Sequence, residues 1–232
     1  MFQRHPQNPL IRPQDAAPSR PGFEVIGTFN AGAVVYQGET VLLVRVAERP
    51  VQNEAGGNQV LVPYYSPEGE LVVREIRRDD PDFDTSDSRF VIHRHTGELF
   101  LTSISHLRLA RSRNGVRFEL EPAPWLKAGQ AEEAFGVEDA RITPVGNRYY
   151  VNYTAVSPLG IATGLVSTHD FAAVERHGII FPPANRDVTL FPCQINGRYV
   201  CYHRPMPGMF GGYNIWMAES PDLRHWGNHR PV

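Results

Sequence analysis

The chain has 232 residues, of which 41% are hydrophobic, and this length is enough for one large domain or two smaller ones with a buried core. Its formal net charge of −2 at pH 7 argues against a general binder of nucleic acid or of anionic membranes, and no apolar run is long enough for a transmembrane helix. The two cysteines and the absence of an apolar leader at the N-terminus favour a reducing, cytoplasmic location, with no disulfide scaffold and no zinc or other metal site.

Residues 1–21 are rich in proline and polar side chains and are predicted to form an N-terminal arm over the surface. From residue 22 to residue 232, helical periodicity is nearly absent, and short β-branched and aromatic runs follow one another. The 20 glycines and 20 prolines fit tight turns between such strands. We therefore predict an all-β domain over 22–232.

Two sequence elements recur along this domain. The first is a glycine turn followed by a strand, and it begins at Gly38, Gly97, Gly146 and Gly197. The second is a strand that ends in a serine before a short polar turn, and its serines are Ser112, Ser167 and Ser220. Both repeat about every 50 residues, which is typical of a β-propeller with one four-stranded blade per repeat. A β-sandwich is the alternative, but the shared phase of the two elements favours the propeller.

Four blades are predicted, beginning near Gly22, Ser86, Gly136 and Asn185. A propeller closes so that no strand edge is left exposed, yet no closing strand follows the last repeat. The chain is therefore expected to be a four-bladed ring or, as we favour, a fragment of a five-bladed propeller that lacks its last blade. The first strand of each blade would line the central channel.

The strands predicted to line the channel are unusually polar. They run over 29–35, 86–92, 136–142 and 185–191, and they contribute Asn30, Asp87, Arg89, Asp139, Arg141, Arg186 and Asp187. The strand after each turn adds further candidates at equivalent positions, namely Arg45, Tyr153 and Arg204, with His203 beside the last. Because side chains alternate along a strand, Asp139, Arg141 and Thr143 are expected to share one face.

Polar groups that converge in this way indicate a ligand pocket in the channel. The alternative is that Asp139 and Arg141 form an ion pair that only closes the channel. Single histidines such as His106 and His203 are, taken alone, more typical of structural residues than of catalytic ones. The recurrence of polar positions in phase across the predicted blades favours the ligand pocket.

Several motifs together resemble those of a known family. In chain order they are FNAGAVV, LLVRV, GVEDARIT, YTAVS, NRDVTLFPCQINGRYVCYHRP and SPDLRHW, and they are similar to glycoside hydrolase family 130, the β-mannoside phosphorylases and related β-mannosidases. The likeness extends from about residue 20 to the end of the chain. It implies a five-bladed propeller that cleaves β-mannosides, with a small oligosaccharide and inorganic phosphate as substrates and no cofactor. The sequence leaves open whether the protein forms a homo-oligomer.

The resemblance also implies roles for single residues. Asp139 matches the catalytic acid, which in the phosphorylases is thought to protonate the glycosidic oxygen through the sugar 3-hydroxyl. Asn30 and Arg45 match positions that hold the mannosyl unit, whereas Arg186 and Arg204 match arginines that hold phosphate. The remaining candidates lie beside these residues in the pattern: to substrate binding we assign Asp87, Arg141, Tyr153 and Asp187, and to phosphate binding His203.

Elementary chemistry supports these roles. Phosphate is already anionic, so phosphorolysis needs no catalytic base, and two arginine forks on adjacent strands suit a bound oxyanion. One acid then suffices, and it works best when it keeps its proton near neutral pH. Arg141 on the same face as Asp139 would oppose this. Either Arg141 turns away, or a neighbouring carboxylate such as Glu138 balances it.

Three other functions stay open. An inverting β-mannosidase would need a second carboxylate, about 6.5–9.5 Å from the acid, to activate water, and Asp187 and Asp87 are the candidates. A glycosidase of the arabinanase or fructosidase type would use Asp87, Asp139 and Asp187 together. A chain without its last blade would alternatively be a non-catalytic carbohydrate-binding fragment. The presence of both Arg186 and Arg204 favours phosphorolysis.

Overall fold

The computed structural model describes residues 3–51 and 57–232, so the first two residues of the predicted arm lie outside the described part. Strands make up nearly all of its regular structure, together with two short 3-10 helices, η1 (Pro13–Asp15) and η2 (Ala131–Glu133). Neither of these helices is long and apolar enough to cross a membrane. The prediction of an all-β fold is confirmed.

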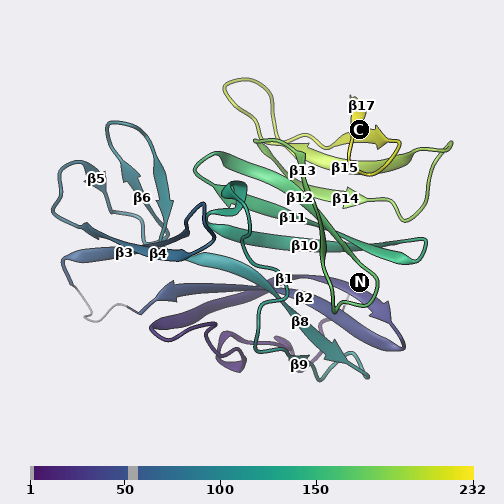
Figure 1. Ribbon diagram of the computed structural model, residues 1–232, viewed down its shortest axis with the longest axis horizontal. Coiled ribbons are helices and arrows are strands. Elements are labelled where there is room, and N and C mark those ends of the chain that lie inside the picture. The colour runs from purple at the N-terminus through teal and green to yellow at the C-terminus, as the bar shows by residue number, and fades with distance from the viewer. Residues whose placement is uncertain (1–2, 52–56) are drawn as a thin grey trace.

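The largest sheet has eight strands, and a single parallel pair, Gly136 with Ser105, joins its two four-stranded halves, which we call units. The first unit is antiparallel, and its strands are not consecutive in sequence (Figure 1). Strand β2 pairs with β1 on one side and with β8 on the other, and β9 pairs with the far edge of β8. The bounds are β1 Phe23–Tyr36, β2 Glu39–Pro50, β8 Ile104–Ser112 and β9 Glu119–Leu120. The β2–β8 ladder has no bulge, so side chains alternate regularly and the ladder presents two distinct faces.

Two further units are each built from four consecutive antiparallel strands. The second unit has the strands β10 Gly136–Val145, β11 Arg148–Ser157, β12 Gly160–Thr168 and β13 Glu175–Phe181. The third unit has the strands β14 Asn185–Leu190, β15 Tyr199–Pro205, β16 Trp216–Ser220 and β17 Gly227–Pro231. The two units pack against each other through a buried cluster that includes Leu165, Val188 and Cys201.

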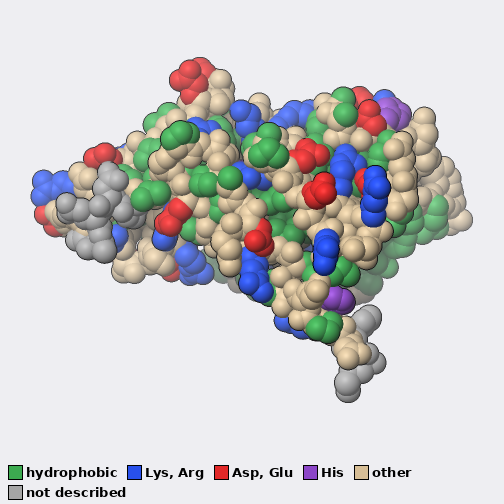
Figure 2. All heavy atoms as spheres, turned by 90° about the horizontal axis from the view of Figure 1, so that it is seen from below, with side chains coloured by type: hydrophobic (Ala, Val, Ile, Leu, Met, Phe, Trp, Pro, Cys, Tyr) green, Lys and Arg blue, Asp and Glu red, His purple; other side chains and the backbone are tan. Residues whose placement is uncertain are grey.

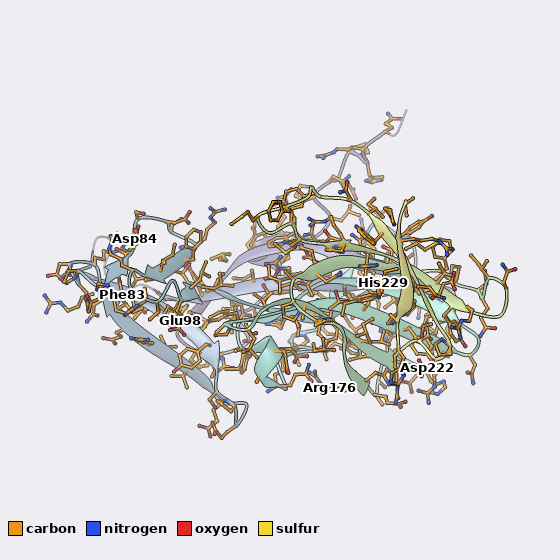
Figure 3. The ribbon with its side chains drawn as sticks, turned by 90° about the horizontal axis from the view of Figure 1, so that it is seen from above. Phe83, Asp84, Glu98, Arg176, Asp222 and His229 are labelled. Carbon is orange, nitrogen blue, oxygen red and sulfur yellow. The ribbon has the colours of Figure 1, made fainter. Side chains whose placement is uncertain are left out.

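The segment between β2 and β8 forms two small sheets apart from the three units. One sheet pairs β3 with β4, and the other contains β5, β6 and β7. The bounds are β3 Gln59–Tyr65, β4 Leu71–Arg77, β5 Phe83–Asp84, β6 Phe90–His93 and β7 Leu99–Leu101. In Figure 3, Phe83 and Asp84 lie toward one end of the molecule, whereas Asp222 and His229 lie in the opposite half.

The predicted second blade is wrong. Residues 86–92, predicted to line the channel, lie in the turn before β6 and in β6 itself, within the small three-stranded sheet. Strand β8, which was expected to complete that blade, pairs with β2 and completes the first unit. The described residues therefore contain three four-stranded units and not four. Residues 97–104 have the composition of a repeat strand, but long-range pairing decides which sheet a strand joins.

The repeated elements have constant places in the three units. The glycine turns at Gly38, Gly146 and Gly197 lead into the second strands, β2, β11 and β15. The repeated serines lie at the ends of the third strands, β8, β12 and β16, and all three are buried: Ser112, Ser167 and Ser220. Three of the four polar runs predicted to be first strands lie in β1, β10 and β14, and the run 86–92 is the exception. The common phase of the two elements therefore reflects one strand order that occurs three times.

Two glycines allow β10 to lie close to β8 and to β1. Gly136 has a positive φ (+108°) and pairs with Ser105 of β8, where a Cβ would lie 2.2 Å from the Ser105 carbonyl oxygen. Gly32 of β1 faces Ala140 of β10, where a Cβ would lie 2.7 Å from the Ala140 carbonyl oxygen. Any side chain at these positions would push the strands apart. Gly136 thus brings β10 against β8, and Gly32 brings β1 against β10.

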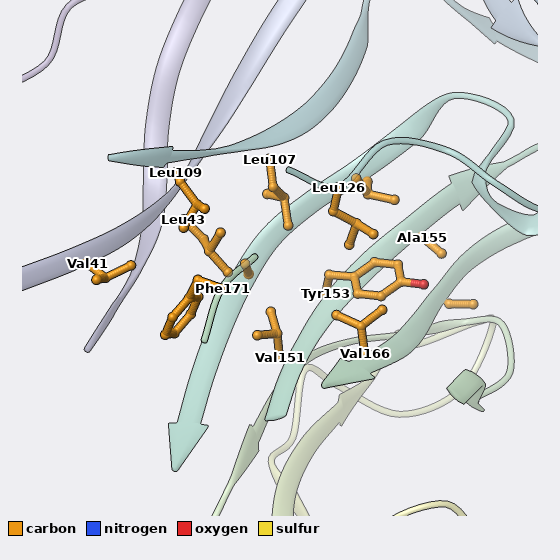
Figure 4. Close-up of a cluster of buried hydrophobic side chains, with 13 residues drawn as sticks. Val41, Leu43, Leu107, Leu109, Leu126, Val151, Tyr153, Ala155, Val166 and Phe171 are labelled. Atoms are coloured by element: carbon orange, nitrogen blue, oxygen red, sulfur yellow. The ribbon is translucent and has the colours of Figure 1, made fainter. Parts of the chain in front are cut away.

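The largest apolar core lies between the first and second units (Figure 4). It contains Val41 and Leu43 of β2, Leu107 of β8, and Tyr153 and Val166 of the second unit. Each of these side chains is fully or almost fully buried. Burial of a large apolar side chain contributes about 1.5–3 kcal/mol, so this core fixes the relative position of the two units.

A second set of buried groups, which we call the arm cluster (Ser19, Glu48, His106 and Arg108), fastens the N-terminal arm to the β2–β8 ladder. Glu48 and Arg108 are fully buried, and Arg108 Nη2 donates to Glu48 Oε1 at 2.8 Å. Ser19 N and Oγ donate to the two Glu48 carboxylate oxygens at 2.8 and 2.6 Å. Arg108 Nη1 donates to the carbonyl oxygen of Ala17 at 2.8 Å, which adds a second link to the arm.

His106 completes the arm cluster as a neutral imidazole. Its Nε2 accepts a hydrogen bond from Arg108 Nε at 2.8 Å, so that nitrogen carries no proton. Burial, aided by the positive charge of Arg108, lowers the pKa of His106 to about 3. This geometry agrees with the structural role predicted for His106.

Candidate active site

The three first strands carry the same irregularity at the same place. Each contains a β-bulge with a non-glycine residue at positive φ, namely Asn30 in β1 (50°), Asp139 in β10 (50°) and Asp187 in β14 (58°). Asparagine and aspartate tolerate this left-handed backbone conformation better than most residues. Bulges re-aim side chains and are frequent next to active sites. Here they direct one amide and two carboxylates toward a common region.

Arg45 of β2 connects the first unit to β10. Its Nη2 lies 2.6 Å from Glu138 Oε1, and its Nη1 lies 3.1 Å from Asp139 Oδ1. Its Nε donates to Ser105 Oγ of β8 at 3.0 Å, which fixes the plane of the guanidinium. Asn30 Nδ2 also donates to Asp139 Oδ1, at 3.0 Å. Asp139 is therefore held by two side chains from the first unit.

Two arginines of the third unit lie beside this group. Arg186 of β14 and Arg204 of β15 are direct cross-strand partners. Arg204 binds Asp187 Oδ2 through Nε at 2.8 Å and through Nη2 at 2.5 Å. Arg186 lies between the two acids, with Nη2 3.8 Å from Asp139 Oδ2 and Nε 3.7 Å from Asp187 Oδ2. The expected pair of arginines on adjacent strands is thus present and reaches Asp139.

We call this set the acid–arginine cluster, and it consists of Asn30, Arg45, Glu138, Asp139, Arg186, Asp187 and Arg204. It contains three carboxylates and three guanidinium groups. Their side chains are 12–32% exposed, so they are largely shielded yet still reachable from solvent. On the face in Figure 2, acidic and basic side chains are interspersed, and no extended single-sign patch is visible there. Within the cluster, the three negative and the three positive side chains pair with one another.

Glu138 is the member of the acid–arginine cluster with a clear shift in its proton affinity. Burial raises the pKa of Glu138, and the negative charge of Asp139 adds to that effect. The positive charges of Arg45 and Arg186 oppose it, but burial is the largest cause. A carboxyl group that holds its proton more tightly than usual therefore lies next to the predicted acid.

The expected alternation over 136–143 is wrong at the bulge. Glu138 and Asp139 contact the same guanidinium, whereas Ala140 is buried in the core and Arg141 is exposed. The register shifts between Glu138 and Arg141, which breaks the regular alternation of side chains. Among the ion pairs of the described residues, Asp139 contacts Arg45 and Arg186 but not Arg141. Of the two explanations left open by the sequence, Arg141 turns away.

The structure places Tyr153 in the core and not in the acid–arginine cluster. Its side chain is 1% exposed and packs among the apolar residues of Figure 4. Its hydroxyl donates to Glu133 Oε1 at 2.5 Å, and burial raises its pKa. The assignment of Tyr153 to substrate binding is therefore corrected. Its position along β11 matches that of Arg45 and Arg204, but the second unit uses this position for packing.

His203 also lies outside the acid–arginine cluster. Its ring stacks on Phe181, its Nδ1 contacts Asn185 Nδ2 at 2.9 Å, and its Nε2 contacts His229 Nδ1 at 3.1 Å. Burial, followed by the charge of His229, lowers its pKa to about 4. A neutral, buried imidazole is a poor ligand for phosphate. His203 and Arg204 are neighbours on β15, so their side chains point to opposite faces of the strand. Arg204 faces the acid–arginine cluster and His203 does not, so the assignment of His203 to phosphate binding is corrected.

Asp87 lies in the small sheet region before β6, and its carboxylate binds Arg89 at 2.8 Å. None of its contacts in the described residues involves the acid–arginine cluster. The structure therefore brings together Asn30, Arg45, Asp139, Arg186, Asp187 and Arg204 from the predicted set. It leaves out Asp87, Arg141, Tyr153 and His203.

Three residues at the site were not predicted as ligands. Glu138 was considered only as a balancing charge, because regular alternation placed it on the opposite face. Ser105 comes from β8, whose pairing with β2 has no local sequence signal. Phe29 lies beneath Arg45, with the guanidinium carbon 4.7 Å from the ring centroid. Its place directly before Asn30 in the FNAGA motif was the available signal.

Comparisons with known proteins agree with this geometry. A family model described as β-1,4-mannooligosaccharide phosphorylase, of the family Glyco_hydro_130, matches residues 86–232. The chain is 45% identical over 230 residues to the β-1,2-mannobiose phosphorylase of Listeria innocua, which covers 98% of this chain and 64% of that enzyme. It is 33% identical over 132 residues to a 1,2-β-oligomannan phosphorylase of Thermoanaerobacter sp., which covers 56% of this chain and 43% of that enzyme.

A solved structure gives the same relationship. The Listeria innocua enzyme in complex with β-1,2-mannobiose superposes with a TM-score of 0.92, over 99% of this chain and 65% of that one. The chain thus spans slightly less than two thirds of the length of this relative. The segment matched by the family model contains Asp139, Arg186 and Arg204 and makes up more than half of the chain. The chain therefore belongs to glycoside hydrolase family 130.

Proposed function

We propose that this protein cleaves β-mannosides by phosphorolysis and releases α-mannose 1-phosphate. The observation that carries the proposal is the position of two arginines. Arg186 and Arg204 are cross-strand partners on β14 and β15, and Arg186 lies within ion-pair distance of Asp139. An oxyanion site thus lies directly beside a candidate acid. The similarity to a β-1,2-mannobiose phosphorylase supports β-1,2-mannobiose as the first substrate to test.

In the proposed reaction, a phosphate oxygen attacks the anomeric carbon while the bond to the leaving sugar oxygen breaks. Asp139 supplies the proton that this oxygen needs, and family membership suggests that it passes through the sugar 3-hydroxyl. Asn30 and Arg45 orient Asp139 and the mannosyl unit. Because the phosphate enters from the face opposite the leaving group, the β-linkage gives an α-phosphate. Positioning of the two reactants supplies much of the acceleration.

The arginine pair has unused donor capacity. Among the described residues, Arg186 Nε is buried and has no hydrogen-bond partner, although Asp187 lies 3.7 Å away. A buried donor without a partner is costly, and a bound oxyanion would satisfy it. Asp187 already holds Arg204, so phosphate would compete with Asp187 for this guanidinium. We therefore assign Asp187 the role of keeping the arginines oriented between catalytic cycles.

Hydrolysis on the same scaffold is the second candidate, and it needs a carboxylate that is free to activate water. Asp187 is bound by Arg204 at 2.5 Å, and this contact occupies one of its oxygens. Asp87 is paired with Arg89 in another sheet. Neither arrangement favours a water-activating base, and this supports phosphorolysis.

A product assay tests the proposal. The protein is incubated with β-1,2-mannobiose or β-1,4-mannobiose, with and without phosphate, and α-mannose 1-phosphate and free mannose are quantified. We expect the sugar phosphate only when phosphate is present. Substitution Arg204→Ala should raise the KM for phosphate by at least about tenfold, because a charge-assisted contact is lost. Release of mannose at the same rate without phosphate would identify a hydrolase.

We further propose that the three four-stranded units are blades of a five-bladed propeller. Their repeated strand order, their equivalent bulges and the close approach of β1 and β10 support this arrangement. The test is whether the three units superpose on three blades of one closed ring in the solved Listeria innocua enzyme. Units that superpose on strands outside such a ring would contradict the arrangement.

A further inference from the structure

We propose that Glu138 is a positioning residue for the acid: by binding Arg45 beside Asp139, it prevents the arginine from fully neutralising Asp139 and so helps Asp139 to retain the proton that it donates. This inference rests on the proposed function of Asp139. It goes further in giving a role to a carboxylate that the proposed reaction does not use.

The first step in the argument is the geometry of the shared guanidinium. The contact of Arg45 Nη2 with Glu138 Oε1 is 2.6 Å long, whereas the contact of Arg45 Nη1 with Asp139 Oδ1 is 3.1 Å long. Charge-assisted hydrogen bonds of this kind are usually about 2.7–2.9 Å long. Arg45 is therefore bound more tightly by Glu138 than by Asp139.

The second step is the balance of charge around Glu138. The groups that face it are Arg45 from β2, Ser105 from β8, Asp139 from its own strand and Arg186 from β14. Two adjacent carboxylates that share one guanidinium repel each other, so the pair as a whole binds a proton more readily than an isolated acid with its own arginine. The raised pKa of Glu138, to which the charge of Asp139 contributes, is one side of this interaction.

The third step is the bulge itself. With regular alternation, Glu138 and Asp139 would point to opposite faces and would not compete for one arginine. The positive φ of Asp139 (50°) brings both carboxylates onto Arg45. The backbone conformation therefore makes the two carboxylates compete for Arg45. Arg186 is a more distant cation, 3.8 Å from Asp139.

Substitution Glu138→Gln tests the inference because it keeps the side-chain volume and an oxygen that accepts from Arg45, and removes only the charge. Without that negative charge, Asp139 ionises more easily. We expect the alkaline limb of the pH profile of kcat/KM to move to lower pH by about one unit, an effect typical of a neighbouring charge. Glu138→Asp, which keeps the charge, should restore the limb in part. A profile identical to that of the unsubstituted protein would overturn the inference.

Glu24→Gln is the matched control. Glu24 forms an ion pair of the same length, 2.6 Å, with Arg49 across β1 and β2, but this pair is exposed and lies outside the acid–arginine cluster. The control removes one negative charge from the neighbouring first unit, away from Asp139, so we expect it to leave the pH profile unchanged. An equal shift in both variants would mean that net charge alone is responsible, and the inference would fail.

A measurement that does not depend on turnover separates this inference from the proposed function. Carbon-13 NMR of the Asp side-chain carboxyls, with Asp139→Asn to assign the Asp139 signal, follows its titration directly. We expect the signal in Glu138→Gln to titrate at lower pH than in the unsubstituted protein. If phosphorolysis occurs but this titration does not move, the role of Glu138 is wrong and the reaction stands. If the titration moves but no substrate is cleaved, the proposed function is wrong and the coupling stands.

Discussion

Two arginine–carboxylate clusters lie on opposite faces of the β2–β8 ladder, and they differ in almost every physical respect. Arg45 of the acid–arginine cluster binds Ser105 on one face of the ladder, whereas Glu48 and Arg108 of the arm cluster bind each other on the opposite face. Because the ladder has no bulge, odd-numbered residues of β8 face one side and even-numbered residues face the other. Ser105 therefore faces the acid–arginine cluster, whereas His106 and Arg108 face the arm. The same pair of strands thus supports a site on one face and a structural fastening on the other.

The difference lies in burial and in the use of donors. Arg108 is fully buried, and its Nε, Nη1 and Nη2 have partners in His106, Ala17 and Glu48. Arg186 of the acid–arginine cluster is 29% exposed in its side chain and keeps one donor without a partner. A fully satisfied buried network has nothing left to offer a ligand, whereas a partly satisfied and accessible one does. Arginine–carboxylate pairing alone therefore does not identify a site.

The largest expected effect comes from the acid. Substitution Asp139→Asn should lower the rate of α-mannose 1-phosphate formation by at least about 100-fold, because a general acid contributes 10²–10⁴. Initial rates at saturating mannobiose and phosphate measure it. The melting temperature should change little, because asparagine keeps the size of the side chain and an oxygen that accepts from Asn30 and Arg45. Turnover close to that of the unsubstituted protein would remove Asp139 from the mechanism.

The opposite result is expected on the other face of the ladder. Substitution Arg108→Ala leaves the Glu48 carboxylate buried and without its arginine, which should cost about 3–5 kcal/mol of unfolding free energy. Urea unfolding measures the loss. Arg49→Ala is the matched control, because its pair with Glu24 is exposed, and it should cost less than about 1 kcal/mol.

If Arg108→Ala does not fold, Ser19→Ala gives a milder test of the arm cluster. It removes the hydroxyl that donates to Glu48 at 2.6 Å and should cost about 1.5–3 kcal/mol. Whichever of the two variants folds, Arg108→Ala or Ser19→Ala, should have the same KM for phosphate as the unsubstituted protein. Equal costs for Ser19→Ala and for an exposed serine would contradict the role of the arm cluster.

The arm cluster should also make stability depend on pH. The pKa of His106 is about 3 in the folded protein and near 6.5 in the unfolded chain, so the unfolded chain binds the extra proton. The stabilisation is therefore complete above pH 6.5 and is lost as pH falls from 6.5 toward 3. Between pH 7 and pH 5 we expect a loss of about 2 kcal/mol.

Substitution His106→Gln checks this assignment, because glutamine offers an acceptor to Arg108 but does not titrate in this range. Unfolding free energies at pH 7 and pH 5 are compared for both proteins. We expect the difference between the two pH values to shrink by about 2 kcal/mol in the variant. Parallel losses in the two proteins would place the pH dependence elsewhere.

The smallest effect is expected from Tyr153→Phe. The substitution removes the hydroxyl that donates to Glu133 and should cost about 1 kcal/mol of stability, since Arg176 still binds this carboxylate. The KM for mannobiose should stay within about twofold of its original value. A large rise in KM without a loss of stability would return Tyr153 to the site.

Much of the fold was predictable because it depends on local pattern. The turn glycines and the ends of the third strands repeat in phase, and these positions occur in all three units. The second predicted blade failed because residues 86–104 have strand-like composition, while the partner of β8 is β2, about 60 residues earlier in the chain. Pairing between distant strands is set by the packing of both faces, which no local pattern records.

The residues of the site were likewise predictable only in part. Residue type alone indicated Asn30, Asp139 and Asp187, and the same three residues occupy the bulges, where asparagine and aspartate accept positive φ. The assumption of regular alternation, however, placed Arg141 at the site and Glu138 away from it. One extra residue in a strand reverses the faces, and its location depends on the register with the neighbouring strand.

Periodicity, turn chemistry and residue type are local properties of the sequence, and they are enough to predict the all-β class, the recurring turn-and-strand elements and the chemical groups of the site. The tertiary structure decided which strands pair, which carboxylates share Arg45, and which arginines are buried and satisfied. Those properties depend on contacts between β2, β8, β10 and β14, which are far apart in the chain. Folding alone brings them within hydrogen-bond distance, and the proposed chemistry depends on that distance.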